Sequence, residues 1–440
     1  MRERVLVIVQ NLPVPLDRRV WLECQALTAA GYSVSVICPK GPGDPARQEI
    51  DEVAIYKYRP APEARGLGGF VIEFVYSWLR TAWLSLRVRR ERGFDVIQAC
   101  NPPDTYWLLA RLWRLRGVTF VFDQHDLNPE LYLSRFGEPT SIGGKVQYGG
   151  LRWLERMTYR TAARVISTNE SYKKIAVTRG HRDPADVTVV RSGPDTRQMR
   201  PVYPPEDIRG EAEHLLVYLG IMGPQDGVDT VLEVIDELVH RRGRTGLRAA
   251  LLGFGDCLDD LKAQCTRLGL DDVVTFTGRA DKAMVADYLS AADVGLCPDR
   301  KTPLNDVSTM NKTMEYMAYA LPSVAFDLVE TRVSGGDTVL YVESGDVQAF
   351  ADAVEKLLDD PDLRADLGIA ARTRVADELD WRPQAERYVS VFDAVSGRKA
   401  LPATGSESRS AGAGTSPAGR DFVDLTNEDE FRRFVIQRRR

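Results

Sequence analysis

The strongest constraint on the fold is a repeated alternation of short, mostly apolar segments with longer segments of helical periodicity. The short segments include residues 5–9, 33–38 and 119–123, and an amphipathic stretch follows each of them. Runs of this kind are typical of parallel strands, which are buried on both faces and covered by the helices between them. The same alternation starts again at residue 215. The pattern predicts an α/β protein with two Rossmann-like domains, each built on a doubly wound parallel sheet.

Changes in composition suggest where the domains end. Residues 1–191 are expected to form the first domain, and the proline- and charge-rich residues 192–214 a linker. Residues 215–380 then form the second domain. Residues 381–395 are expected to form a C-terminal helix that could cross back to the first domain. The remainder, residues 396–440, begins rich in Ser, Gly and Ala, so we expect a mostly disordered tail.

Residues 299–331 combine a charged loop, a helix and a short buried strand. Four apolar residues recur at helical spacing: Met314, Met317, Ala318 and Leu321. Ser308 and Thr309 are expected to cap this helix, and Pro322 ends it before a strand at residues 324–326. The stretch therefore predicts a helix that begins shortly after the end of a strand.

Two charged side chains of this helix indicate a ligand site. Lys312 lies in the first turn, where a positive charge opposes the helix dipole by about 0.3–1 kcal/mol. An anion would make that position favourable, because free backbone amides and a lysine together suit a phosphate. Glu315 follows one turn later, where its carboxylate could reach the mouth of a cleft. A solvated lysine and a glutamate at the rim of the core are the alternative interpretations.

Composition excludes several classes of protein. The net charge of -5 gives no general attraction to nucleic acid, and 44% hydrophobic with 28% charged residues is typical of a soluble globular protein. The six cysteines lack CxxC spacing, so we expect free buried thiols rather than disulfides or a zinc site. The first residues enter a strand without a signal-peptide cleavage region. We therefore expect a cytoplasmic protein.

Residues 66–93 resemble a membrane segment more than any other stretch, but Glu73 and Arg80 interrupt their apolar run. Four arginines follow the aromatic residues: Arg87, Arg89, Arg90 and Arg92. This pattern fits a helix that lies in a membrane interface, and the alternative is a core helix with an exposed basic end. Residues 67–92 are therefore a candidate contact with the inner face of the plasma membrane.

Parallel sheets bind ligands beyond the carboxyl ends of their strands. Six segments follow such ends: residues 11–17, 101–104, 125–130, 220–227, 253–255 and 299–312. We expect the chemistry to lie in these segments, in a cleft between the two domains.

Five motifs in and around these segments resemble, in order and spacing, the retaining glycosyltransferases of family 4, which have the GT-B fold. They are DQHD with PE in residues 123–130, YLGIMGPQDGVD in 218–229, LLGFG in 251–255, FTGR and AADVGLCP in 276–298, and NKTMEYMAYALPSVAF in 311–326. The resemblance covers nearly all of residues 1–396. It implies two domains facing a central cleft and transfer of a sugar from a nucleotide diphosphate donor. It also implies a glycan acceptor, lipid-linked in the members that build cell-surface polysaccharide.

The resemblance assigns roles to individual residues. Glu315 matches the glutamate that holds the ribose, and His125 matches a histidine that faces donor sugar and acceptor; these are the expected catalytic residues, although a structural histidine is the alternative. The other expected donor-binding residues are Gly223, Gly253, Phe254, Gly255, Arg279, Thr309, Met310, Asn311 and Lys312. The expected acceptor-side residues are Asn101, Asp104 and Asp126. No metal and no cofactor is expected, because helix amides and a cation would stabilise the leaving diphosphate.

The chain departs from the family pattern at several places. The first glutamate of the family's pair falls at Val307, with Asp306 beside it as a substitute. The usual donor-loop cations fall near Ile221 and Asp226, and paired glycines are absent from residues 11–16. Three cations could compensate: Arg300, Lys301 and Lys312. These departures leave open a non-catalytic nucleotide-sugar-binding or scaffold protein and a GT-B sugar-nucleotide epimerase. A dehydrogenase is disfavoured, because no GxGxxG follows the first strand.

Overall fold

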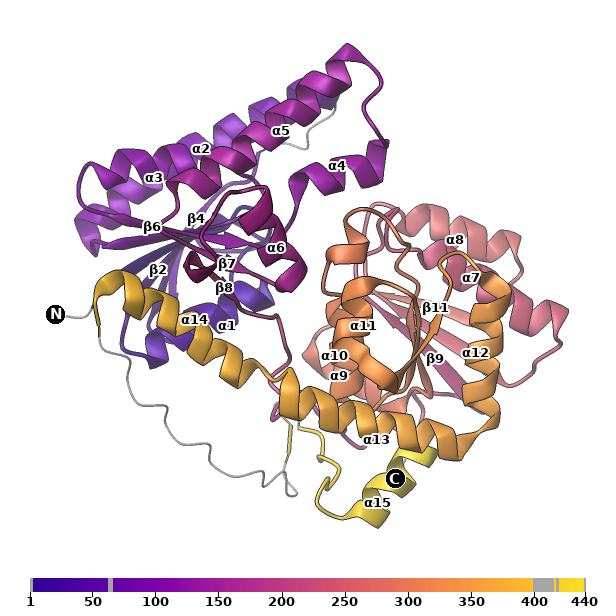
Figure 1. The fold of residues 1–440 in the computed structure, drawn as a ribbon. Helices are drawn as coiled ribbons and strands as arrows, with labels where there is room; N and C mark the ends of the chain where they lie inside the picture. Colours follow the sequence, from indigo (N-terminus) through magenta and orange to yellow (C-terminus); the bar gives the residue numbers. More distant parts are fainter. Residues whose placement is uncertain (1–2, 62–65, 399–414, 417–418, 439–440) are drawn as a thin grey trace. The chain divides into compact units, whose positions relative to one another are not determined.

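The computed structural model describes residues 3–61, 66–398, 415–416 and 419–438, and the chain divides into two compact units (Figure 1). The first unit comprises the chain up to Ser192 together with the segment that begins at Arg382. The second comprises Gly193–Trp381 together with the described C-terminal residues. Each unit has its own sheet and its own hydrophobic core, so the predicted fold class is confirmed.

In the described chain the first unit's sheet has eight strands, in the order β3-β4-β2-β1-β5-β6-β7-β8. They are β1 (Arg4–Ile8), β2 (Ser33–Pro39), β3 (Arg47–Ile50), β4 (Val53–Tyr58), β5 (Val96–Cys100), β6 (Thr119–Gln124), β7 (Arg164–Ser167) and β8 (Val187–Val189). All pairs are parallel except β3 with β4, an antiparallel edge that the sequence did not predict. The strand order reverses between β1 and β5, and ligands bind parallel sheets at such a point.

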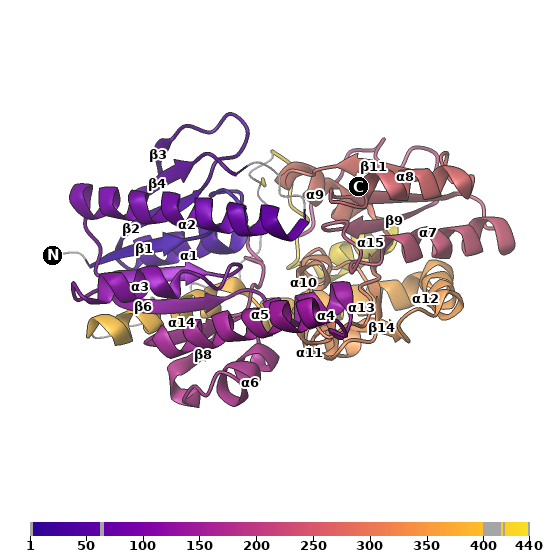
Figure 2. The same ribbon diagram turned by 90° about the horizontal axis from the view of Figure 1, so that it is seen from above.

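Helices cover both faces of this sheet (Figures 1 and 2). The helices of this unit are α1 (Arg18–Ala29), α2 (Gly66–Glu91), α3 (Trp107–Arg114), α4 (Asn128–Phe136), α5 (Ile142–Thr161), α6 (Glu170–Thr178) and α14 (Trp381–Ser396). Helices α2, α3 and α5 lie over one face, and α1 and α14 lie over the other (Figure 1).

The second unit's sheet is entirely parallel, in the order β11-β10-β9-β12-β13-β14. Its strands are β9 (His214–Leu219), β10 (Leu247–Leu252), β11 (Val274–Gly278), β12 (Val294–Cys297), β13 (Ser323–Phe326) and β14 (Val339–Val342). Its α-helices are α7 (Val228–Asp236), α8 (Leu258–Arg267), α9 (Lys282–Ala291), α10 (Asn311–Ala318), α11 (Val329–Gly335), α12 (Val347–Asp359), α13 (Pro361–Glu378) and α15 (Glu428–Gln437). The chain builds this sheet outward from β9 in one direction and then returns to β12 on its other side. The reversal between β9 and β12 therefore marks the expected binding edge.

Two helices begin at residues that their local sequence does not favour. Glycines at positions 143, 144, 149 and 150 disfavour a helix, but α5 begins at Ile142, where the Ser141 hydroxyl accepts a hydrogen bond from the Gly144 amide at 3.0 Å. This cap and the packing of Tyr148 on Tyr132, with ring centroids 5.8 Å apart, offset part of the cost of about 1 kcal/mol for each helical glycine. Helix α10 begins after Met310, which provides no side-chain cap, so the predicted caps Ser308 and Thr309 are not its N-cap.

Part of the C-terminal tail is ordered, contrary to the expectation of mostly disordered residues 396–440. Residues 399–414 lie outside the described residues, but α15 forms beyond them and packs on α13. Phe431, Phe434 and Val435 are buried at this contact, and their spacing is that of one helical face. The described residues 419–438 therefore include a helix packed into the second unit, contrary to that expectation.

All six cysteines are free thiols, and five of them are buried. None of the helices in the described part of the chain combines the length and apolar composition that a bilayer-spanning segment requires.

Candidate active site

Loops from neighbouring strands interlock at the carboxyl edge of the second unit's sheet. The Met222 amide, after β9, donates a hydrogen bond to the Phe254 carbonyl, after β10, at 2.9 Å. The Asn305 side chain, after β12, donates to the Gln225 carbonyl at 2.9 Å. Residue 253 must be glycine for this packing, because a Cβ there would lie 1.8 Å from the Gly220 carbonyl oxygen. The predicted segments 220–227, 253–255 and 299–312 therefore form one contiguous surface of this unit.

Tyr316 fixes helix α10 against this edge. Its hydroxyl accepts from the Leu219 amide at 2.8 Å and donates to the Leu296 carbonyl at 3.2 Å, so it joins β9 to β12. Within the eight residues of α10, the side chains of Asn311 and Glu315 remain accessible, and the other six residues are buried. Asn311 and Glu315 are four residues apart, so their side chains lie on the same face of α10, and Asn311 is the first residue of that helix.

Lys312 lies buried in the first turn of α10, where it forms an ion pair with Asp299. Its Nζ atom lies 5.2 Å from the ring centroid of Tyr218, and its Cε atom packs against Gly220. Burial alone would lower the pKa of Lys312, but the negative charge of Asp299 opposes it and the pKa is raised. The ammonium group is therefore held charged near the first amides of the helix, with Asp299 as its counterion.

The other cations that were predicted to compensate are also paired with carboxylates. Arg300 forms an ion pair with Asp229, and Lys301 lies 3.5 Å from Asp306. The Asp306 carboxylate also accepts a hydrogen bond from the Val329 amide at 3.0 Å, at the start of α11. Of the cations predicted for this edge, Lys312 is the one placed in the first turn of α10.

An exposed cation and an exposed aromatic ring lie at the end of β10 and β11. The guanidinium carbon of Arg279 lies 4.8 Å from the ring centroid of Phe254, which is 38% exposed. The backbone of Gly255 packs against Met222 so closely that a Cβ would come within 2.6 Å. A flat ring with a cation over it suits a planar ligand, because aromatic bases stack on both groups.

Asn101 organises the corresponding edge of the first unit. Its side-chain oxygen accepts from the backbone amides of His125 at 2.7 Å and Asp126 at 3.1 Å. Its Nδ2 atom donates to the Asp126 carbonyl at 2.8 Å and to the Asp104 carboxyl at 3.2 Å. The structure therefore brings together the three predicted acceptor-side residues and His125.

Two carboxyl groups at this edge titrate near neutral pH. Burial raises the pKa of Asp104 to about 7, although hydrogen bonds from Asn128 and Asn101 oppose the rise. Burial also raises the pKa of Asp126 to about 6, against the opposing charge of His125. Groups with such pKa values can exchange protons at physiological pH, and they cluster at active sites.

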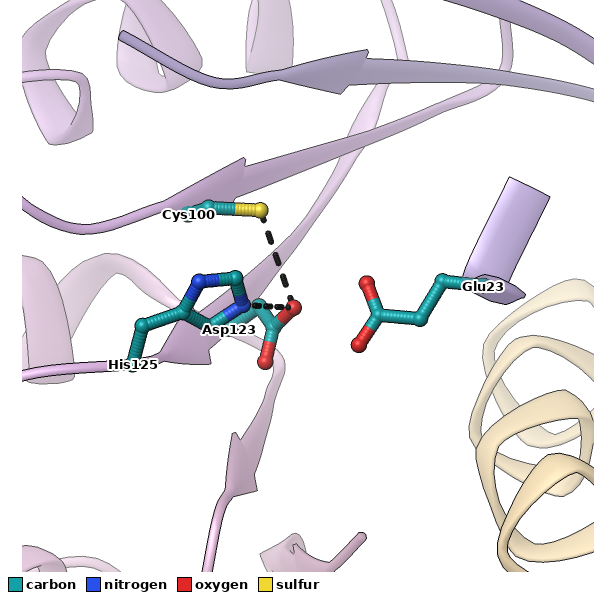
Figure 3. A group of neighbouring side chains, drawn as sticks. All are labelled: Glu23, Cys100, Asp123 and His125. Atoms are coloured by element: carbon teal, nitrogen blue, oxygen red, sulfur yellow. Dashed lines mark hydrogen bonds and ion pairs between the residues drawn. The ribbon is translucent and has the colours of Figure 1, made fainter. Parts of the chain in front are cut away.

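His125 is anchored in a cluster of buried polar side chains with Glu23, Cys100 and Asp123 (Figure 3). The Nε2 atom of His125 lies 2.8 Å from Asp123 Oδ2, and the Cys100 sulfur lies 3.6 Å from the same oxygen. Arg19, one turn before Glu23 on α1, contacts Glu23 at 2.9 Å and Asp123 at 3.2 Å. Sequence reasoning missed Arg19 and Glu23, although their opposite charges at i,i+4 were an available signal.

The ligand atoms of Glu23, Cys100, Asp123 and His125 all lie within 4.8 Å of one another, a spacing that a metal ion could bridge. However, the Arg19 guanidinium contacts three of these side chains, including His125 Nε2 at 3.1 Å. A cation therefore already compensates the buried carboxylates, and the donor set fits an ion-pair network better than a metal centre.

Comparison with known proteins identifies both units. Residues 16–193 match the family model described as "Glycosyl transferase 4-like domain", and residues 213–360 match "Glycosyl transferases group 1". The chain is 28% identical over 292 residues to alpha-D-kanosaminyltransferase of Streptomyces kanamyceticus, a match that covers 63% of this chain and 71% of that protein. It is 27% identical over 308 residues to alpha-maltose-1-phosphate synthase of Mycolicibacterium smegmatis, covering 64% and 74%.

Solved structures show the same fold. Sucrose-phosphate synthase from Thermosynechococcus elongatus superposes with a TM-score of 0.72 at 19% identity, over 90% of this chain and 100% of that one. HepE from Anabaena, in complex with UDP, superposes with a TM-score of 0.63 at 14% identity, over 90% and 100%. The family matches favour a transferase over the epimerase and scaffold alternatives. With two parallel α/β units that each match a glycosyltransferase domain, the chain is a glycosyltransferase of the GT-B fold.

Proposed function

We propose that this glycosyltransferase is a retaining enzyme of family 4 that takes its sugar from a nucleotide diphosphate donor. The observation that carries the proposal is helix α10, which buries six of its eight residues yet presents Glu315 one turn after a buried, charged Lys312. A nucleotide offers a matching pair of groups, a ribose diol and a diphosphate. UDP and ADP in solved structures of the same fold also support a nucleotide donor.

In this proposal, each part of the donor has its own partner on the second unit. The Glu315 carboxylate accepts hydrogen bonds from the ribose hydroxyls, and the first-turn amides of α10 hold the diphosphate with Lys312. The Arg279 and Phe254 pair provides a stacking surface for the base. Backbone amides and a fixed cation stabilise the leaving diphosphate without reorganisation, so no metal or cofactor has a role in the proposed reaction.

The first unit supplies the acceptor side. His125 positions the donor sugar, and Asn101, Asp104 and Asp126 bind the acceptor. Because the proposal includes no enzymic nucleophile, the acceptor hydroxyl attacks from the face that the diphosphate leaves. The diphosphate oxygen then takes the acceptor proton, and the configuration at the sugar is retained.

We propose further that the acceptor is a lipid-linked glycan, used in building cell-surface polysaccharide at the inner face of the plasma membrane. Helix α2 buries one face but leaves Leu79, Trp83 and Leu86 exposed on another. Trp113 joins α3 to α2 through a 3.0 Å hydrogen bond to Ser85, and three leucines of α3 and its C-cap are also exposed. They are Leu108, Leu112 and Leu115. Apolar residues at helical spacing beside exposed arginines are typical of an interface with an anionic membrane.

Replacing Glu315 with alanine is expected to weaken nucleoside diphosphate binding about 10- to 100-fold, since hydrogen bonds to a charged group contribute roughly 1.5–3 kcal/mol. The fold should be unaffected, because Glu315 is accessible. Titration calorimetry with UDP, GDP and ADP measures the loss and also identifies the base. Glu233→Ala, an exposed helical glutamate of the same unit, is the control and should bind like the wild type. Equal affinity in the two variants would remove Glu315 from the donor site.

Reversing two exposed arginines, Arg90→Glu with Arg114→Glu, is expected to reduce binding to phosphatidylglycerol vesicles at least tenfold, because each basic residue near the surface contributes about 1 kcal/mol. Arg89 and Arg92 are less suitable targets, since Arg89 donates to the Phe94 carbonyl and Arg92 pairs with Glu49. Flotation measures the bound fraction. The control is the same charge change on α8, namely Lys262→Glu with Arg267→Glu. Vesicle binding that both variants reduce equally would contradict a membrane surface on α2 and α3.

A further inference from the structure

A chain of buried hydrogen bonds connects the C-terminal helix α14 to the partner of His125. The Tyr388 hydroxyl on α14 donates to Gln98 Oε1 at 2.5 Å. The Gln98 Nε2 atom donates to Glu23 at 2.9 Å and to Asp123 Oδ2 at 2.8 Å. All four side chains are buried, so no solvent competes for these bonds.

The network allows one orientation of the Gln98 amide. Its NH2 group faces the carboxyl groups of Glu23 and Asp123, which accept, and its carbonyl oxygen faces the Tyr388 hydroxyl, which donates. In the reversed orientation the carbonyl oxygen would lie against the Asp123 carboxylate, and two acceptors would then oppose each other. The two carboxyl groups therefore set the orientation of the amide, and the Tyr388 hydroxyl gives the buried Gln98 carbonyl oxygen the partner that holds it in this position.

Asp123 in turn determines which nitrogen of His125 carries a hydrogen. The Asp123 carboxylate accepts hydrogen bonds from the Arg19 guanidinium at 3.2 Å and from Gln98 at 2.8 Å, and these contacts favour its ionised form without a charge on His125. An ionised carboxylate can only accept, so the Nε2 atom 2.8 Å away must be the donor. The close Arg19 Nε atom cannot then donate to Nε2, but the guanidinium has other acceptors, including Glu23 at 2.9 Å and the Val190 carbonyl at 2.9 Å.

The second ring nitrogen of His125, Nδ1, points away from Asp123 (Figure 3). No residue in the described ranges forms a hydrogen bond with it. When Nε2 carries the hydrogen of a neutral imidazole, Nδ1 is an acceptor, and a sugar hydroxyl is a matching donor.

We propose that Tyr388 is a positioning residue for the transfer reaction: acting through Gln98 and Asp123, it holds His125 with Nε2–H bound inside the protein and Nδ1 available to accept a hydrogen bond from a donor-sugar hydroxyl. The inference rests on the proposed placement of His125 at the reacting sugar. It gives helix α14, which follows α13 directly in the chain, a role in the geometry of the site as well as in packing.

The first test compares two tyrosines that attach the same helix. Tyr388→Phe removes the hydroxyl that donates to the Gln98 carbonyl oxygen, and Tyr32→Phe removes a buried hydroxyl that donates to Asp393 on α14 at 2.7 Å. Each variant loses one buried phenol hydrogen bond to or from α14, so their effects on packing are matched. We expect Tyr388→Phe to lower kcat about 10-fold or more, the size of effect seen when a group that orients a ligand is lost, with little change in KM. Tyr32→Phe should retain kcat within about twofold. Equal losses in both variants would show that Tyr388 serves the fold alone and would overturn the proposal.

The second test measures, by NMR of the histidine ring nitrogens, which nitrogen of His125 carries a hydrogen, and it needs no catalytic turnover. The chain has four histidines, so the nitrogen resonances of His125 can be assigned by their loss in His125→Gln. The wild type should show protonated Nε2 and unprotonated Nδ1, and Tyr388→Phe and Gln98→Met should each shift this pattern. An unchanged His125 pattern in Gln98→Met would overturn the proposal even if Tyr388→Phe failed to fold.

Two further outcomes separate this inference from the proposed function. If His125→Gln keeps full activity while the tautomer depends on Tyr388 as expected, the role of His125 at the sugar fails, but the hydrogen-bond chain stands. The purified protein could instead contain one equivalent of tightly bound metal that Cys100→Ser loses. This result would overturn the proposed hydrogen-bond network, because Asp123 and His125 would then be metal ligands.

Discussion

A chain that ends at residue 414 is expected to lose most of the stability of its second unit. Among its described residues, the deleted segment buries four apolar side chains: Val423, Phe431, Phe434 and Val435. Burial of such a side chain contributes about 1.5–3 kcal/mol, so their combined loss approaches the whole unfolding free energy of an ordinary domain, roughly 5–15 kcal/mol.

Polar contacts add to this effect. Arg438 is buried and donates to the carbonyls of Tyr319, at 3.1 Å, and Ala320, at the end of α10. Its removal would leave these carbonyls without their partner beside a newly exposed apolar surface. The Arg200 guanidinium, which lies 4.4 Å from the Phe422 ring, would lose that contact as well.

Thermal unfolding followed by circular dichroism measures the loss. We expect the shortened chain to unfold at a much lower temperature or to aggregate on expression. Phe434→Ala should lose about 3–5 kcal/mol. Arg432→Ala, which breaks only surface ion pairs with Asp362 and Asp366, should lose less than about 1 kcal/mol. A shortened chain as stable as the full one would show that α15 does not support the second unit.

Replacing Asp299 with alanine is expected to destabilise the second unit by about 3–5 kcal/mol, since it leaves the buried ammonium of Lys312 without a counterion. The matched control is Asp229→Ala, which breaks the ion pair with Arg300 on the same loop. Both partners of that pair are about 40% exposed, so the expected loss is at most about 1 kcal/mol.

A double variant separates the structural role of this pair from binding. Asp299→Leu with Lys312→Met replaces both charges with apolar groups, so it should recover most of the stability that either single change loses. It should nevertheless bind nucleoside diphosphates weakly, because the cation of the first turn is gone. Denaturant unfolding and calorimetry on the same samples measure both quantities. Wild-type affinity in a stable double variant would rule out Lys312 as a diphosphate ligand.

Some features of the site were predictable because they depend on residues close together in the chain. The strands, the helix that carries Lys312 and Glu315, and the loops at the strand ends follow from local periodicity and from motif order. Local patterns were misleading where packing decided the outcome. Helix α5 runs through glycines, and α15 forms beyond a segment whose composition predicted disorder.

The sequence by itself therefore determined the two α/β units, their strand ends and the residue types available there, because hydrophobic periodicity acts over a few residues at a time. Only the tertiary structure decided which charges meet. Lys312 is neutralised by Asp299, from the loop after β12, and His125 is anchored by Asp123 and Arg19, from β6 and α1. The Tyr388 to Gln98 bond joins residues 290 positions apart. Such partners are chosen by the folded arrangement of strands and helices, and no local spacing encodes them.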